Sequence, residues 1–277
     1  MDEITAEITV EAVVPQIRLR VKPHLSFGAK TDMGKVRENN EDKHEFFIAE
    51  KESDLAAKGH VFVVCDGMGG HEAGQCASEI ACKTFIDVYR SHPSEDYMAA
   101  TRAAVTAATR FIHDISLAIP SRKGMGTTLV ALIFRQDAVL IVNVGDSRAY
   151  RLRNGEVEQL TTDHTWVEET VAAGMMTREE AEAHPYRHVI TRALGTERDV
   201  ACDLFEHPLA EGDVFMVCSD GVTNHVADDQ IGRILATAHP SEAAWRLVGD
   251  ALVGGGSDNA TAIVVRVDGL EFLETDQ

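Results

Sequence analysis

The chain has 277 residues, of which 44% are hydrophobic, so it is long and apolar enough to bury a sizeable core. Its 26 Lys and Arg residues stand against 45 Asp and Glu residues, and the resulting net charge of −19 argues against general binding to nucleic acid or to anionic membranes. The five cysteines are scattered and show no C-x-x-C spacing, which fits a reducing compartment. The first residues lack the pattern of a signal peptide, and no apolar run approaches the roughly 20 residues of a membrane helix. We therefore expect a cytoplasmic protein that binds neither nucleic acid nor membrane.

Residues 1–24 alternate loosely between apolar and polar side chains. Pro15 and Pro23 argue against one long strand here, because proline has no N–H to donate to a neighbouring strand. We treat this part as an N-terminal extension of unknown role. Residues 25–270 show neither an internal repeat nor a low-complexity linker, and we expect them to form a single domain.

The first half of this domain begins with two apolar runs, 44–50 and 60–65, which are predicted as strands. Residues 73–89 place small and apolar side chains along one helical face, which predicts a helix. Ser94 is a suitable N-cap for a second, alanine-rich helix that runs to about residue 117. Two helices are therefore expected in succession after the first pair of strands.

The second half again shows paired elements. Asn154 and Gly155 lie between two alternating runs, which is typical of a hairpin with a type I′ turn. The other predicted elements are strands at 128–134, 138–144, 213–218 and 260–267, helices at 228–237 and 241–252, and a polar, helix-like stretch at 165–185. Tight turns between paired strands favour antiparallel sheets. The pattern predicts an α+β fold, a four-layer α-β-β-α sandwich of two antiparallel sheets flanked by helix pairs.

Carboxylates stand at the ends of apolar runs in four places. Asp66 follows VFVVC, Asp146 follows LIVNVG, Asp220 follows FMVCS, and Asp258 precedes NATAIVV. A single Asp-Gly pair is most often a turn, but turns do not require the acid to follow an apolar run each time. Carboxylates that lie together repel one another unless cations neutralise them. Oxygen ligands point to Mg²⁺ or Mn²⁺ rather than to zinc.

The stretch DGMGGHEAG at residues 66–74 combines one of these acids with a glycine cluster. It lacks the lysine of a P-loop, and it does not follow the G-x-G-x-x-G pattern of dinucleotide-binding folds. Gly67 allows a sharp turn after Asp66 and exposes a carbonyl that a metal ion can bind. Gly69 and Gly70 let the chain pass close to the site.

Seven motifs resemble, in their order, those of the metal-dependent type 2C protein serine/threonine phosphatases, the PPM family. They span about residues 26–267 and are highly specific as a set, although none is so alone. The stretch 174–195 is similar to the bacterial branch of the family, in which it belongs to a flap over the active site, and we place the flap at about 165–190. The motifs are TDMGKVRENNED (31–42), DGMGGH (66–71), GMGTTL (124–129), VGDSRAY (144–150), HVITRALG (188–195), CSDGV (218–222) and SDNAT (257–261).

The resemblance implies a ligand set for two ions at the core, Mn²⁺ or Mg²⁺. Asp66 matches the carboxylate that bridges the two ions, and the carbonyl of Gly67 serves the second ion. Asp220 and Asp258 match the carboxylates that hold the first ion. Asp146 matches a ligand of a third, weaker ion in bacterial members, which it shares with Asp220.

Glu41 and Asp42 match residues that hold metal-bound waters. Arg37 matches the arginine that grips the substrate phosphate, a role that suits the planar fork of a guanidinium. A surface salt bridge is the alternative interpretation of Arg37. The resemblance implies attack at phosphorus by a hydroxide that bridges the two ions, with Arg37, Asp66 and Asp220 as the catalytic residues.

The general acid is not identified by the sequence. Animal members of the family carry a histidine directly after the Asp-Gly pair, where this chain, like bacterial members, has Met68. His71 and a water on the third ion are candidates, while a helix-capping role is the simpler interpretation of His71. The remaining histidines, His188 among them, form no metal-like cluster in the sequence, and we expect most to be surface or core residues. Thr128 is expected to pack or hydrogen-bond near the site, and Asn259 to orient a loop.

We therefore expect a monomeric phosphatase that hydrolyses phosphoserine and phosphothreonine in proteins and so reverses the action of a bacterial Ser/Thr kinase. Two alternatives stay open, an inactive member that binds phosphoproteins or senses metal, and a phosphatase of small phosphate esters. Loss of Asp66, Asp220 or Asp258 would mark an inactive member, and all three are present. An open cleft accepts many esters, so the sequence separates small from protein substrates poorly.

Overall fold

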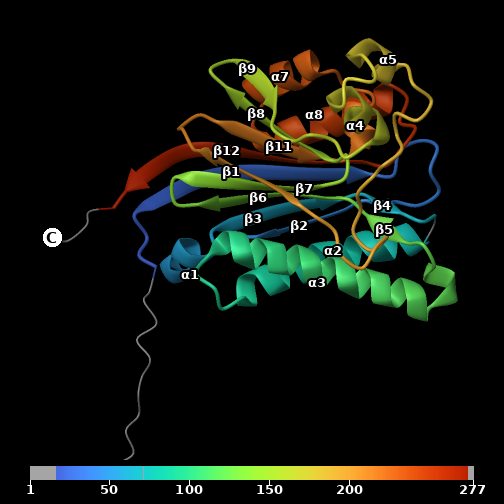
Figure 1. Cartoon of the computed structure of the whole chain (residues 1–277). Helices are drawn as coiled ribbons and strands as arrows, with labels where there is room; N and C mark the ends of the chain where they lie inside the picture. Colours follow the sequence, from blue (N-terminus) through green and yellow to red (C-terminus); the bar gives the residue numbers. More distant parts are fainter. Residues whose placement is uncertain (1–16, 71, 274–277) are drawn as a thin grey trace, which may run out of the picture.

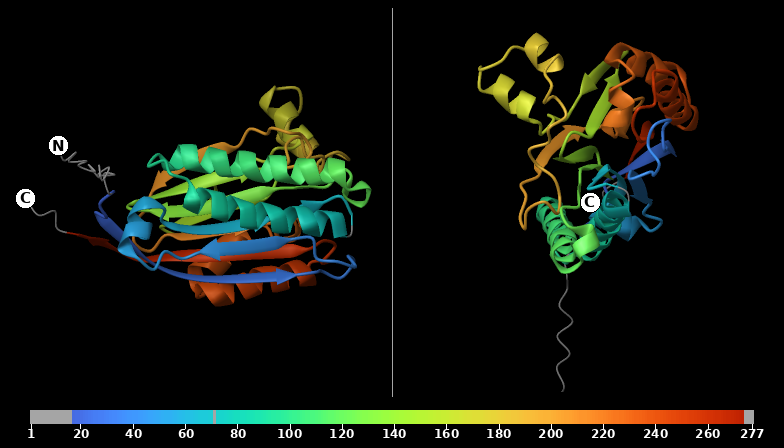
Figure 2. Two further views of the ribbon diagram at one scale, coloured as in Figure 1. Left: turned by 90° about the horizontal axis from the view of Figure 1, so that it is seen from below. Right: turned by 90° about the vertical axis from the view of Figure 1, so that its right-hand side faces the viewer.

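The computed structural model describes residues 17–70 and 72–273. In this part of the chain two five-stranded antiparallel sheets lie face to face, and a pair of helices covers the outer face of each sheet (Figures 1 and 2). The predicted α+β fold, a four-layer α-β-β-α sandwich, is confirmed.

The first sheet, sheet A, combines strands from both ends of the chain. Its strands, in spatial order, are β1 (Val21–Asp32), β12 (Ala260–Phe272), β11 (Val214–Cys218), β8 (Arg148–Arg153) and β9 (Glu156–Gln159). The predicted hairpin joins β8 to β9, and both of its turn residues, Asn154 (φ 53°) and Gly155 (φ 84°), have the positive φ of a type I′ turn. Helices α7 (Asp228–Thr237) and α8 (Pro240–Val253) cover the outer face of this sheet.

The second sheet, sheet B, is packed between sheet A and the two longest helices of the described part. Its strands, in spatial order, are β10 (Asp203–Pro208), β7 (Ala138–Val144), β6 (Leu129–Arg135), β3 (His60–Cys65) and β2 (Lys43–Phe47). The helices on its outer face are α2 (Glu72–Ser91) and α3 (Tyr97–Ala118).

Short elements connect these layers. They are α1 (Glu52–Ala57), η1 (Pro120–Arg122), α4 (Trp166–Ala172), α5 (Arg178–Glu182), α6 (Asp220–Thr223) and the two-residue ladder of β4 (Gly67–Met68) with β5 (Gly126–Thr127). The helix-like stretch 165–185 therefore consists of two short helices, α4 and α5. None of the helices in the described part has both the length and the apolar character that crossing a bilayer requires.

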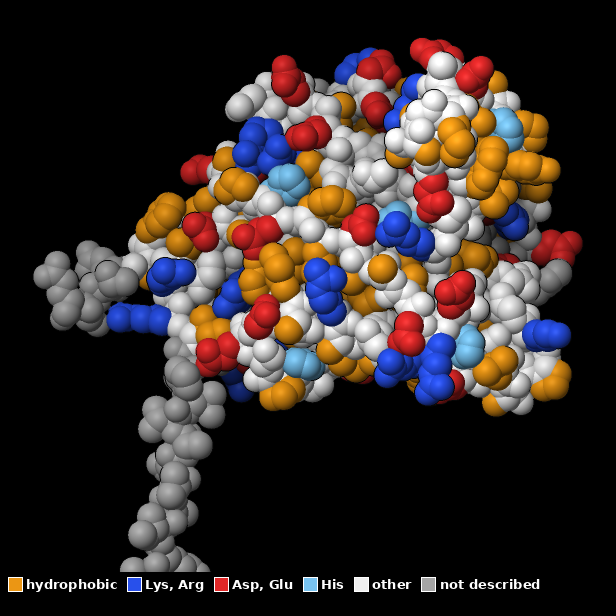
Figure 3. All heavy atoms as spheres, in the orientation of Figure 1, with side chains coloured by type: hydrophobic (Ala, Val, Ile, Leu, Met, Phe, Trp, Pro, Cys, Tyr) orange, Lys and Arg blue, Asp and Glu red, His pale blue; other side chains and the backbone are white. Residues whose placement is uncertain are grey.

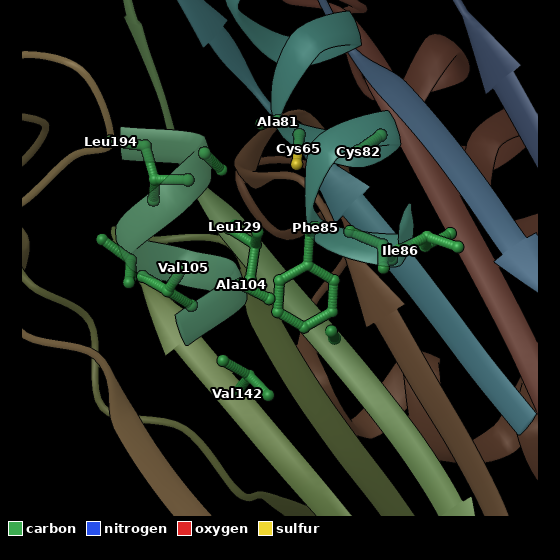
Figure 4. Close-up of a cluster of buried hydrophobic side chains, with 14 of the residues drawn as sticks. Cys65, Ala81, Cys82, Phe85, Ile86, Ala104, Val105, Leu129, Val142 and Leu194 are labelled. Carbon is green, nitrogen blue, oxygen red and sulfur yellow. The ribbon is translucent and has the colours of Figure 1, made fainter. Parts of the chain in front are cut away.

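The main core has three layers of apolar side chains, one between the sheets and one under each pair of helices. Between the sheets, the rings of Phe62, Phe134 and Phe215 pack edge to face, with Phe134 5.8 Å from Phe62 and 5.4 Å from Phe215 between ring centroids. Outside sheet B, Phe85 of α2 packs among side chains of β3, β6 and β7 (Figure 4). Both faces of sheet B are covered, which explains why residues 61–65 of β3 are apolar throughout instead of alternating.

The N-terminal boundary predicted from the sequence was wrong. Residues 21–24, assigned to the extension, belong to β1, which runs through Pro23 and pairs with β12. Proline is tolerated because β1 is an edge strand, with one side free of a partner strand in the described structure, and because the register shifts just after it, between His24 and Leu25. Pro15 lies outside the described residues.

Two further predictions need correction. The N-cap of α3 is Asp96, whose carboxylate accepts from the backbone N–H groups of Met98 and Ala99, whereas Ser94 accepts from the N–H of Asp96 itself. The strand predicted at 44–50 ends at Phe47. Neither error changes the order of the layers.

Two glycines in the β1–β12 ladder offer a matched stability test. A Cβ on Gly28 would overlap backbone atoms of Ser241 in α8, whereas a Cβ on Gly269 would meet no described atom within 4 Å. Gly28→Ala is expected to lower the free energy of unfolding by about 2–3 kcal/mol, and Gly269→Ala to leave it within about 0.5 kcal/mol of the parent. Denaturant titrations measure both values, and equal losses would contradict the close packing of α8 on β1.

Candidate metal centre

The four acids that end or begin predicted strands lie at one edge of the sandwich. In sheet B, β3 and β7 both pair with β6 in antiparallel fashion and so run parallel to each other, which places Asp66 and Asp146 at the same edge. In sheet A, β12 starts where its antiparallel partner β11 ends, which brings Asp258 near Asp220. The two sheets thus supply two carboxylates each.

These carboxylates interact strongly. Burial raises the pKa of Asp66 well above its ordinary value, and the neighbouring charges of Asp42, Asp220, Asp146 and Asp258 raise it further. Burial likewise raises the pKa of Asp42 to about 7 and of Asp146 to about 8, and it raises the pKa of Asp220. The ionised forms of this cluster are therefore poorly stabilised by the protein alone.

Three carboxylate oxygens at this edge are unpartnered. Oδ1 of Asp42, Oδ1 of Asp146 and Oδ1 of Asp220 are buried and have no hydrogen-bond partner among the residues that the structure describes. Buried acceptors of this kind are costly to leave alone, and divalent ions that prefer oxygen would satisfy them. The donor set therefore fits Mg²⁺ or Mn²⁺.

The carboxylates at this edge do not by themselves form a complete coordination shell for a metal ion. Within residues 17–70 and 72–273, no group of three or more His, Cys, Asp or Glu side chains is arranged to hold an ion by itself. One reason is that Asp258 is engaged elsewhere, since its Oδ2 accepts from Nη2 of Arg37 (2.7 Å) and its Oδ1 from the N–H of Asn259 (2.8 Å). Ion binding at this edge thus requires other oxygen ligands, such as water, or release of Asp258 from Arg37.

The backbone of Asp66 is held in place by two threonines. Its N–H donates to Oγ1 of Thr128 (2.9 Å), and its carbonyl accepts from the N–H of Thr128 (2.9 Å) and from Oγ1 of Thr127 (2.8 Å). The next residue, Gly67, fits only without a side chain, because a Cβ there would overlap the backbone of Gly74 in α2. Asp66 therefore projects from a rigid turn.

Asn259 anchors the loop that carries Arg37. Its Nδ2 donates to the carbonyls of Met33 (2.8 Å) and Asn39 (2.9 Å), and its Oδ1 accepts from the N–H of Glu41 (2.8 Å). The expectation that Asn259 orients a loop agrees with these contacts. Arg37 itself is 53% exposed at the side chain, so one face of the guanidinium is open to solvent.

Asp42 lies beneath the cluster and not on its surface. Only 1% of the residue is exposed, and Oδ2 accepts from Oγ of Ser219 (2.7 Å) at the end of β11. Its second oxygen is one of the three unpartnered ones. Asp42 therefore links the loop before β2 to sheet A and keeps one oxygen available at the site.

A cleft of about 550 Å³ opens beside the acids. Asp146 and Asp220 lie on one side of it, and residues of α4, α5 and the following segment, including Arg187 and His188, lie on the other. The predicted flap at 165–190 is this second side, and it projects from one end of the sandwich in Figure 2. Met175, Tyr186 and Val189 of the flap are exposed. Figure 3 shows apolar side chains gathered over this part of the surface.

His188 is a site residue that the sequence did not single out. It is exposed, as expected for most of the remaining histidines, but it lines the cleft together with Asp220. Its place in the motif HVITRALG was the available signal. His71, the other histidine considered, lies outside the described residues.

Comparison with known proteins supports this interpretation of the site. The model of the protein phosphatase 2C family matches residues 35–254. The chain belongs to the protein phosphatase 2C family.

Two curated relatives in the phosphatase 2C family carry related names. The "Serine/threonine protein phosphatase PstP" of Mycobacterium tuberculosis is 38% identical over 256 residues, which cover 92% of this chain and 48% of that protein. The "Serine/threonine phosphatase stp" of Listeria monocytogenes is 36% identical over 244 residues, or 86% of this chain and 94% of that protein. The chain thus spans about half the length of the PstP relatives but nearly all of the Listeria one.

A solved phosphatase 2C structure shows metal in a similar fold. The crystal structure of the catalytic domain of PstP in complex with two manganese ions has a TM-score of 0.75 and 37% identity. The similarity covers 88% of this chain and 99% of that one. The relative holds two ions on the fold that, in this chain, brings four aspartates to one edge.

The stabilisation that Mn²⁺ gives this phosphatase 2C chain is expected to grow with pH. The raised pKa values of Asp42 and Asp146 mean that the ion-free folded state binds more protons than the unfolded state from about pH 4 to 8, so its stability falls as pH rises through that window. Ions bind the deprotonated carboxylates. A fixed Mn²⁺ concentration of about 100 times the Kd at pH 8 should raise Tm by roughly 5–10 °C near pH 8 and by less near pH 5, where the Kd is higher. Equal shifts in differential scanning calorimetry at both pH values would contradict this picture.

Proposed function

We propose that this chain is a metal-dependent phosphatase that hydrolyses phosphoserine and phosphothreonine in proteins. The observation that carries the proposal is the set of unpartnered carboxylate oxygens at one edge of the sandwich, beside an exposed arginine and an open cleft. The printed names of the M. tuberculosis and L. monocytogenes relatives support the same activity. The substrates we infer are phosphoproteins made by a Ser/Thr kinase, and we infer a cytoplasmic monomer.

We assign the acids to ions as follows. Asp66 and the carbonyl of Gly67 would hold one ion, Asp66 with Asp220 and Asp258 a second, and Asp146 with Asp220 a third and weaker one. The charge of Asp220 raises the pKa of Asp66, so the two carboxylates lie close together, which supports a shared ion. Mn²⁺ or Mg²⁺ at this place supplies a water activated for attack and neutralises charge on the phosphoryl group.

The residues around the ions would hold waters and bind the substrate phosphate. Glu41 and Asp42 would hold waters at the ions, and the unpartnered oxygen of Asp42 supports this role. Arg37 would grip the phosphate with the exposed face of its guanidinium. Met68 has no proton to transfer, so the proton for the leaving hydroxyl comes from another group or from solvent.

The direct test compares hydrolysis of a phosphothreonine peptide with and without Mn²⁺, in the parent and in Asp66→Asn. We expect turnover that needs the metal and that Asp66→Asn nearly abolishes. Metal-independent turnover would refute the proposed mechanism, and no turnover of any phosphate ester would favour the inactive, phosphoprotein-binding alternative. Faster turnover of p-nitrophenyl phosphate than of every peptide would favour the small-ester alternative.

The flap is expected to influence which peptides are hydrolysed, because it forms one side of the cleft next to Asp220. Exchanging residues 165–190 for the matching segment of the Listeria relative should change the ranking of kcat/KM among phosphopeptides by several-fold. Turnover of p-nitrophenyl phosphate, which is too small to reach along the flap, serves as the control. An unchanged ranking in a folded, active chimera would show that the flap does not select substrates.

A further inference from the structure

His164 lies directly before the flap and binds both polar backbone groups of one glycine. The residue is 4% exposed. Its ring Nδ1 accepts from the N–H of Gly145 (3.0 Å), and its own N–H donates to the carbonyl of Gly145 (2.9 Å). Asp146 follows Gly145 directly, so His164 fixes the stretch of backbone from which Asp146 projects.

The orientation of the His164 ring is itself determined. Because a backbone amide donates to Nδ1, the neutral ring carries its proton on Nε2. Nε2 lies 3.1 Å from Oδ2 of Asp203, at the start of β10, and therefore donates to it. The other oxygen of Asp203 accepts from Nη1 of Arg192 (3.2 Å). Asp203 thus fixes the orientation of the His164 ring, in the way that carboxylates orient histidines that bind metal ions.

The same loop supports Asp66. Gly145 has a φ of 106°, and a Cβ there would overlap the side chain of Thr128, whose Oγ1 accepts the N–H of Asp66. Oγ1 of Thr128 also lies 2.7 Å from Oγ of Ser147. A displacement of Gly145 would therefore disturb the supports of two of the acids.

His164 also closes the base of the flap. Its carbonyl accepts from the N–H of Thr191 (2.8 Å), and the N–H of Trp166 donates to the carbonyl of Val189 (2.9 Å). Thr165 forms an antiparallel bridge with Ile190. One residue therefore connects both ends of the flap to the loop that carries Asp146.

We propose that His164, oriented by Asp203, is a positioning residue that sets the place of the Asp146 carboxylate and thereby the affinity for the divalent ion that Asp146 and Asp220 share. This inference rests on the proposed function for the ion assignment. His164 itself contacts neither ion nor substrate and acts through Gly145.

The test measures Mn²⁺ binding by isothermal titration calorimetry, and the Mn²⁺ concentration for half-maximal hydrolysis of a phosphothreonine peptide. His164→Ala should weaken binding at one site, and raise the half-maximal concentration, by about 10-fold or more, with kcat recovered at excess Mn²⁺. His164→Asn keeps an acceptor for the N–H of Gly145 and should recover most of the loss. Asp203→Ala should shift both values in the same direction by a smaller factor, and the control His207→Ala, on the same strand β10, should leave them unchanged.

Parent-like Mn²⁺ binding in folded His164→Ala, with only Tm lowered, would overturn the inference and leave His164 a structural residue. If His164→Ala does not fold, Asp203→Ala decides the matter, since Asp203 is partly exposed and parent-like binding in that variant would also overturn the inference. A parent protein that binds Mn²⁺ but hydrolyses no ester would refute the proposed function alone, because the calorimetric comparison of variants remains valid.

Discussion

Replacing Asp220 by alanine is expected to reduce kcat by about 1,000-fold or more, because several kcal/mol of charge stabilisation at the phosphoryl group would be lost. Asp220 is the first residue of α6, two residues after the last residue of β11. Its Oδ2 accepts from Asn224 (3.0 Å), while its Oδ1 is buried without a partner among the described residues. We assign this carboxylate to two ions, so its removal affects both. Steady-state kinetics at saturating Mn²⁺ measure the loss.

The control for this experiment is Asp137→Ala. Asp137 is an exposed acid in the turn between β6 and β7, at the edge of sheet B opposite to the metal centre, so its removal changes net charge by the same amount without touching the site. The kcat of Asp137→Ala should equal that of the parent. If Asp220→Ala retained a kcat within threefold of the parent value, the ion assignment of Asp220 would be wrong.

Arg37→Ala is expected to raise KM by roughly 10- to 100-fold, the effect of losing a charged hydrogen bond worth about 1.5–3 kcal/mol. The structure shows that Arg37 also pairs with Asp258 at 2.7 Å. Because this pair competes with an ion for Asp258, the variant should not need more Mn²⁺ than the parent. Initial rates over a matrix of peptide and Mn²⁺ concentrations separate the two effects.

Arg37→Lys is the matched control, since it keeps the positive charge but loses the planar fork. Its KM should lie between those of the parent and of Arg37→Ala. A large fall in kcat at an unchanged KM would show that Arg37 acts on the transition state and not on substrate binding.

Much of the site was predictable because its acids lie at the ends of apolar runs. Once strands are antiparallel, residues at alternate strand ends come to one edge, and Asp66, Asp146, Asp220 and Asp258 do so here. The pairing of Arg37 with Asp258 and the approach of His188 to Asp220 were not predictable. They depend on side-chain directions that only the tertiary structure sets.

The fold, like the site, was only partly predictable from the sequence. Hairpins and helix pairs follow from local patterns, but β10 was missed because its run, DLFEHP, mixes charged residues and a proline with few apolar ones. That composition suits an edge strand, which is half exposed and packs little apolar surface. The pairing of β1 with β12, from Val21 opposite Phe272 to Asp32 opposite Ala260, joins residues far apart in sequence and has no local signal.

The place of β1 has a consequence for the order of folding events. Its neighbour in sheet A is β12, so β1 and β12 can pair only after a loop that spans most of the chain has closed. Such a long-range closure is a slow step in folding. Arg37 and Asp42 follow β1 in the chain, and the closure that completes sheet A therefore also brings Arg37 to Asp258 and Asp42 to Ser219. The ion that we assign to Asp66, Asp220 and Asp258 would take its ligands from both sheets, so it can bind only a chain whose distant segments have already met. Its binding would therefore report completed folding instead of guiding the early steps.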